Sequence, residues 1–127
     1  MSQRYTKEER LKSLSDIGAL FEKGDHVFAY PIRTMFLKMD EMTIFPQVGF
    51  SIPKRSFKKA HDRNLIKRRM REAYRLNAGP FKEWFKTKEF SIKLMFIYID
   101  KEILDYAKIE HSMVKCLQKL MPDTTLS

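Results

Sequence analysis

The chain has 127 residues, 43% of them hydrophobic and 32% charged, and its net charge is +9 at pH 7. This length suits one domain with a single core, and the hydrophobic share excludes a disordered chain. The longest apolar run, residues 94–99, is too short for the ~20 residues that span a bilayer, and the N-terminus lacks an apolar signal core. With Cys116 as its one cysteine, the chain is predicted to be cytoplasmic and free of disulfides.

The first helical pattern covers residues 13–23. Thr6 and Glu9, ahead of it, have the spacing of a capping box, and Gly24 stands where a glycine often ends a helix. Its apolar positions share one face: Leu14, Ile17, Leu20 and Phe21.

Three strands are predicted next, over residues 26–30, 32–39 and 47–53. Pro31 should break or bulge the pairing of the first two, because proline cannot donate to a strand ladder. In the third strand large and small residues alternate: Val48, Phe50 and Ile52 face one way, and Gly49, Ser51 and Pro53 the other. The small side chains would leave the backbone of this strand accessible. Alternatively, small residues on an exposed sheet face need no special explanation.

The segment 54–75 contains ten Lys or Arg and two acidic residues, so it carries +8 of the net charge of +9 and leaves about +1 for the other 105 residues. From Asp62, a plausible N-cap, it is predicted to form a helix of about four turns that ends before a turn at Gly79-Pro80. One face is predicted to be buried: Ile66, Met70, Ala73, Tyr74 and Asn77. The opposite face is polar and basic: Asn64, Lys67, Arg68, Arg71 and Arg75.

Such sorting of charge indicates a polyanion site. Like charges four residues apart on a helix repel, and a phosphate backbone relieves that repulsion and releases counterions on binding. Alternatively the face is merely solvated, although solvated faces usually mix both signs.

Beyond this helix, residues 81–88 are predicted to form a short helix whose Trp84 either packs on Phe81 and Phe85 or stacks on a base. Residues 92–99, apolar on both faces apart from Lys93, are typical of a central strand. Asp105 should cap a last helix that ends at Leu120, before Pro122. Its inward positions are Ile109, Met113, Leu117 and Leu120.

Catalytic chemistry lacks a convincing pattern. The three histidines, His26, His61 and His111, fall in three different predicted elements, so a two-histidine nuclease is a minor alternative. Asp100, Glu102 and Asp105 surround a helix start, where carboxylates usually cap or are solvated, and Cys116 fits a buried hydrophobe.

The predicted fold is a single α+β domain over residues 1–127, with an ordered core of about 10–120. Its order is α-β-β-β-α-β-α, with helices packed on a four-stranded sheet. If the third and last strands are parallel neighbours, the general rule gives a right-handed crossover.

Residues 63–75 resemble the RNxxKRxxRExxR signature of the protein subunit of bacterial ribonuclease P. Residues 48–55 (VGFSIPKR) and 10–24 (RLKSLSDIGALFEKG) are similar to the strand and the first helix of that family. The likeness covers roughly residues 10–120 and implies a left-handed crossover. Between Arg55 and Arg63 the sequence departs from the family, with Phe57 where many relatives have a glycine turn and with one additional residue.

The resemblance implies that a catalytic RNA subunit performs Mg²⁺-dependent cleavage at the 5′ leader of precursor tRNA, and that the protein binds both RNAs without a cofactor of its own, without DNA and without a membrane. By the same resemblance the leader lies between the first helix and the sheet, near Phe21 and Ile17. The residues implied to contact the catalytic RNA are Arg63, Asn64, Lys67, Arg68, Arg71 and Arg75, and the preceding loop adds Lys54, Arg55, Lys58 and Lys59. An RNA-binding or ribosome-associated module without a role in cleavage is the main alternative.

Overall fold

The computed structural model describes residues 5–40, 43 and 45–121. Its core element is a four-stranded sheet with the order β1-β2-β4-β3. The strands are β1 (Asp25–Ala29), β2 (Ile32–Met39), β3 (Gln47–Ser51) and β4 (Ser91–Tyr98). β2 runs antiparallel to both β1 and β4, whereas β3 and β4 are parallel. The four predicted strands are therefore confirmed.

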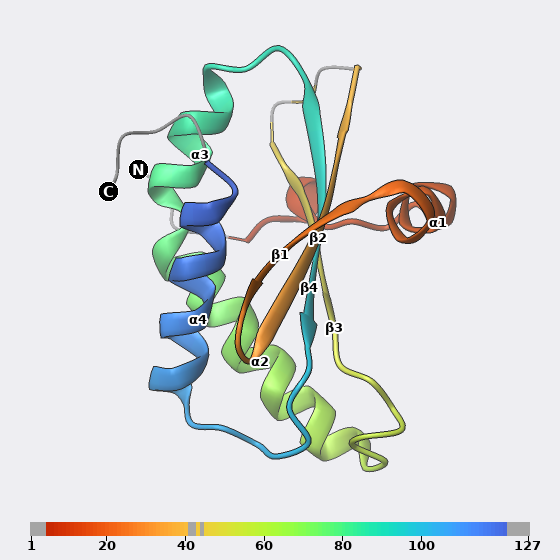
Figure 1. Ribbon diagram of the computed structural model, residues 1–127, viewed down its shortest axis with the longest axis vertical. Helices are drawn as coiled ribbons and strands as arrows, with labels where there is room; N and C mark the ends of the chain where they lie inside the picture. Colours follow the sequence, from red (N-terminus) through yellow and green to blue (C-terminus); the bar gives the residue numbers. More distant parts are fainter. Residues whose placement is uncertain (1–4, 41–42, 44, 122–127) are drawn as a thin grey trace.

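The helices divide unequally between the two faces of this sheet. They are the 3₁₀ turn η1 (Lys7–Glu9), α1 (Leu14–Lys23), α2 (Ala60–Asn77), α3 (Gly79–Lys86) and α4 (Tyr106–Lys119). Figure 1 shows α2, α3 and α4 on one side of the sheet and α1 on the other. The predicted α+β order is confirmed, and α2 with α3 forms the connection between the parallel strands. The left-handed sense of that connection stays a prediction, as does the position of Pro122, which lies outside the described residues.

β4 shows why two layers of helices form. Every residue of this strand is buried, as predicted for a central strand. Because successive side chains point to opposite faces, Leu94 and Phe96 join the large core under α2 and α4, whereas Met95 and Ile97 join a small cluster under α1. Among the described residues, no helix is long and apolar enough to cross a membrane.

α1 buries less than its sequence predicts. Ser13 caps it by accepting a hydrogen bond from Asp16 N, and Leu20 is fully buried. Leu14 is 85% exposed and Phe21 49% exposed, however, because within the described residues α1 is the one α-helix on its face of the sheet and has no helical neighbour to cover its flanks.

Several predicted boundaries change for local reasons. α2 begins at Ala60 with Lys59 as its N-cap, so Asp62 lies in the first turn instead of capping it. Gly79 and Pro80 belong to the first turn of α3, where the missing N–H of proline carries no penalty. The predicted capping box of Thr6 and Glu9 is present, in a 3₁₀ turn.

Gly24 and Pro31 lie where predicted but act differently. Gly24 has an extended backbone (φ −69°, ψ 153°), and it is required because a Cβ there would lie 2.4 Å from Leu20 O. Pro31 follows a cis peptide bond in the two-residue connection between β1 and β2, and the pairing runs unbroken up to Ala29 and Ile32. The predicted interruption of the pair at Pro31 is therefore wrong.

Candidate nucleic-acid interface

The two faces of α2 are sorted as the sequence predicts. Its inner face is fully buried at Ile66, Met70, Ala73 and Tyr74. On its outer face Asn64, Arg68 and Arg71 are exposed and Lys67 is half-buried. Packing of the apolar side on the sheet and on α4 therefore fixes the direction in which the polar side points.

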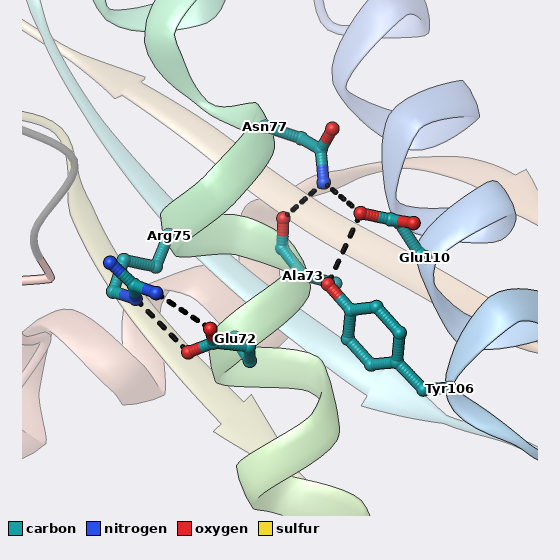
Figure 2. Close-up of polar contacts among 6 residues, drawn as sticks. All are labelled: Glu72, Ala73, Arg75, Asn77, Tyr106 and Glu110. Atoms are coloured by element: carbon teal, nitrogen blue, oxygen red, sulfur yellow. Dashed lines mark hydrogen bonds and ion pairs between the residues drawn. The ribbon is translucent and has the colours of Figure 1, made fainter.

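Three cations of this outer face, Lys67, Arg68 and Arg71, have no carboxylate within 4.0 Å in the described part of the chain. Arg75 differs, because its guanidinium lies 2.6 Å from a carboxylate oxygen of Glu72, one turn back (Figure 2). The hydrogen bond to Arg75 lowers the pKa of Glu72, so this carboxylate stays ionised and offsets part of the charge of Arg75. The strongest anion-binding potential of α2 therefore lies at its first three outward cations.

Asn77, predicted to face inward, joins two helices. Its side-chain nitrogen donates to Ala73 O at 2.8 Å and to the carboxylate of Glu110 in α4 at 2.9 Å. Tyr106 donates to the same carboxylate at 3.1 Å. Figure 2 shows this network on the side of α2 away from the Arg75–Glu72 pair, so it fixes α2 against α4 without using the outward cations.

Arg63 has a structural role that the sequence did not reveal. Its guanidinium donates to Phe57 O at 2.7 Å and to Lys58 O at 3.0 Å, and so ties the preceding loop to the start of α2. Phe57 is 6% exposed, with its ring centroid 5.9 Å from that of Tyr98. Phe57 thus anchors the loop in the core.

The loop also presents exposed cations: Lys54, Arg55, Lys58 and Lys59. Arg55 lines a cavity of about 700 Å³ together with Arg33 of β2 and Lys101, over Ile97 of the sheet. The sequence did not reveal Arg33 and Lys101, although Arg33 is a charged residue near the start of a largely apolar strand and could have been noticed for that reason.

A second groove, of about 400 Å³, joins α2 to the α1 side of the sheet. Lys67 and Arg71 of α2 line it, and so does Ile17 of α1. Gly49 forms part of its floor, where a Cβ would come within 3.1 Å of the Met95 side chain. The small side of β3 therefore does keep a surface open. Phe21, predicted beside Ile17, is exposed on α1 but is not one of the residues that line this groove.

The segment before α1 supplies the remaining wall of this groove, through Tyr5, Arg10, Leu11 and Lys12. Tyr5 donates to Val48 O at 2.5 Å. Burial raises the pKa of Tyr5 to about 12, against the lowering effect of Arg10 and Arg71, so the phenol stays protonated and keeps this bond. Sequence reasoning did not find Arg10 and Lys12, because their approach to α2 is a tertiary contact.

The residues considered for catalysis lie apart. His26, His61 and His111 are exposed on β1, α2 and α4 respectively. Asp105 accepts from Lys108 N at 3.0 Å and so caps α4 as predicted.

Two other predictions concerned packing. Cys116 is fully buried, and burial raises the pKa of its thiol. Trp84 packs on Phe81, with ring centroids 5.7 Å apart, which confirms the packed patch.

Comparison with known proteins identifies the family. The family model for ribonuclease P matches residues 5–121. A ribonuclease P protein component from Porphyromonas gingivalis is 28% identical over 116 residues, which cover 91% of this chain and 85% of that protein. Another, from Blochmanniella floridana, is 26% identical over 115 residues, with 91% and 86% covered.

Solved structures share the fold. The ribonuclease P protein from Thermotoga maritima matches with a TM-score of 0.68 at 22% identity, covering 87% of this chain and 96% of that one. The ribonuclease P protein from Staphylococcus aureus matches with a TM-score of 0.64 at 20% identity, with 90% and 96% covered. On the match of the family model to almost the whole chain, this protein belongs to the ribonuclease P protein family.

Proposed function

We propose that this chain acts in the cytoplasm as the protein subunit of ribonuclease P, binds the catalytic RNA and the 5′ leader of precursor tRNA, and thereby promotes endonucleolytic 5′ maturation of tRNA. The observation that carries the proposal is the row of outward cations on α2, Lys67, Arg68 and Arg71, without acidic partners in the described part of the chain. A folded RNA offers the dense phosphate charge that such a row attracts.

Repulsion between like charges within α2 favours the binding of an anion. Lys67 and Arg71 are four residues apart, and such a like-charge pair destabilises a helix by roughly 0.2–0.5 kcal/mol. Phosphates between and above these side chains would remove that penalty. Arg68 and Arg71 can each hold a phosphate through two hydrogen bonds, and exposed Asn64 can donate and accept beside them.

In this proposal the protein supplies no acid, base or nucleophile. Hydrolysis belongs to the RNA subunit with its Mg²⁺ ions, and the chain contributes affinity and lowers phosphate repulsion where RNA strands meet. The leader is assigned to the α1 side of the sheet, where Ile17 lines the groove and the half-exposed ring of Phe21 stands nearby on the same helix.

Reconstitution tests the proposal. The purified protein alone should cleave no precursor tRNA, and its addition to the cognate catalytic RNA at low Mg²⁺ should restore cleavage at the leader junction. Normal affinity for that RNA without any effect on cleavage would contradict the proposal and support a binding module. Cleavage that survives rigorous removal of RNA and is lost on replacing His61 or His111 would instead indicate a protein-only nuclease.

A further inference from the structure

The groove beside α2 carries positive charge on both walls. Lys67 and Arg71 project from α2 on one side, and Arg10 and Lys12 come from the segment before α1 on the other. Among the described residues, none of these four has a carboxylate within 4.0 Å. Four unpaired cations around about 400 Å³ repel one another, and an anionic ligand between the walls would relieve that repulsion.

The second wall is held in place by the backbone edge of β3. Leu11 N donates to Val48 O at 3.0 Å, and Arg10 pairs with Val48 as an isolated parallel bridge. Gln47 donates from its side chain to Glu8 O at 2.7 Å. The segment is therefore an added partial strand, and its backbone is fixed relative to the sheet at Arg10 and Leu11.

A buried ion pair completes the anchor. Glu9 is 1% exposed, and its Oε1 lies 2.6 Å from Lys82 Nζ in α3. Its other oxygen, Oε2, accepts from Thr6 N at 3.2 Å and from Thr6 Oγ1 at 3.1 Å. A buried pair of this kind adds little to stability compared with apolar residues, so its effect on position is the better explanation.

The ion pair with Lys82 also keeps the Glu9 carboxylate from neutralising the cations of the groove. Glu9 precedes Arg10 in the chain and could neutralise it, but its carboxylate is directed to Lys82. Arg10 instead lies over the ring of Tyr5, with its guanidinium carbon 5.7 Å from the ring centroid. The acidic residue nearest in sequence to the basic wall is thus used elsewhere.

We propose that residues 5–12 form the second wall of a binding site for single-stranded RNA, in which Arg10 and Lys12 contact phosphates and the Glu9–Lys82 pair positions them. The inference rests on the proposed function and extends the RNA surface beyond α2. Aromatic rings of Tyr5 and Phe50 line the groove beside the cations, a combination that single-stranded nucleic acid uses. A duplex carries its phosphates on the outside and would reach one wall alone.

The single strand can come from the leader or from an unpaired part of the catalytic RNA. The test compares Arg10→Ala/Lys12→Ala with Lys108→Ala/Lys115→Ala, which removes the same charge from two exposed lysines of α4 that do not line the groove. One arm measures the affinity of the protein for the catalytic RNA. The other measures the affinity of the assembled holoenzyme for precursor tRNA with a leader and for tRNA without one.

The double variant should bind about tenfold more weakly than its control in one arm, with a salt slope flatter by roughly 1.4 for two phosphate contacts on a single strand. A loss of affinity confined to tRNA with a leader assigns the groove to the leader. A loss of affinity for the catalytic RNA assigns the groove to an unpaired part of that RNA. Equal behaviour of the two double variants overturns the inference. If Arg71→Ala still weakens binding in that case, the proposed function survives.

Glu9→Gln tests the positioning role by the sign of its effect. The substitution adds one positive unit to the net charge, so simple electrostatics predicts tighter RNA binding. Positioning predicts weaker binding, because the segment loses its charged link to Lys82. Affinity equal to or above that of the unchanged protein overturns the positioning role. Urea unfolding of each variant verifies the fold, and the exposed Arg10 and Lys12 keep the test valid if Glu9→Gln fails to fold.

Discussion

The two faces of the sheet differ in how much they bury. Among the described residues, the face under α2, α3 and α4 holds a cluster of 20 buried residues, whereas the face under α1 holds five. The groove with four cations and the cavity with Arg33, Arg55 and Lys101 both open along the thinly covered face or its border with α2. Stability thus comes mainly from one face, and the other face is left free for ligands.

The largest loss of stability is expected from a cavity in the core under α2, α3 and α4. Phe96 of β4 is fully buried, with its ring centroid 5.7 Å from that of Phe50 and 5.8 Å from that of Tyr74. Phe96→Ala should lower the free energy of unfolding by about 3–5 kcal/mol, because the rigid neighbours cannot close the space. Urea denaturation monitored by Trp84 fluorescence measures this loss.

Leu20→Ala is the corresponding large-to-small change in the small cluster under α1. Leu20 is equally buried, but its cluster is small and borders solvent, so the site can relax. We expect a loss of about 2 kcal/mol, at the low end for such a substitution. A loss as large as that of Phe96→Ala would show that the two faces contribute equally, contrary to the comparison.

A loss of stability of intermediate size is expected at an ion pair under α1, and it should differ between the two partners. Lys93 Nζ lies 3.7 Å from Asp16 Oδ2, and the Lys93 side chain is 3% exposed. Asp16→Asn removes one countercharge of Lys93 and should destabilise the protein by about 1–3 kcal/mol, whereas Lys93→Met replaces the buried charge by an apolar chain and should change stability by less than about 1 kcal/mol.

Urea unfolding of both variants measures this asymmetry. Equal losses for Asp16→Asn and Lys93→Met would mean that the pair itself stabilises the α1 layer. In that case the thin face would owe its stability to charge instead of to its apolar cluster.

The sequence predicted what depends on local pattern. Buried and outward residues of α2 follow a 3.6-residue period, so both faces were correct. The burial of β4 on both faces and the cap at Asp105 are equally local, and both predictions were correct.

The sequence did not show the roles that depend on tertiary contacts. Arg69 is one of the ten cations of the basic segment, and its guanidinium donates to Leu104 O at 2.7 Å, in the segment before α4. Contact of Arg63 with RNA stays a prediction, because its bonds to Phe57 O and Lys58 O do not test it. Arg10 and Lys12 look like ordinary surface charge until the fold brings them opposite α2. A sequence shows how many cations a chain has, whereas the fold decides which of them lack partners.

The smallest expected change is the most direct test of the central claim, that the outer face of α2 binds RNA. The affinity of the protein for the catalytic RNA is measured against salt concentration. If about five side chains meet phosphates, log K should fall with log[salt] with a slope of roughly −3.5 to −4.5. Arg71→Ala should flatten this slope by about one unit, and Arg75→Ala by less, because Glu72 already pairs with Arg75. A slope that Arg71→Ala leaves unchanged would contradict the claim.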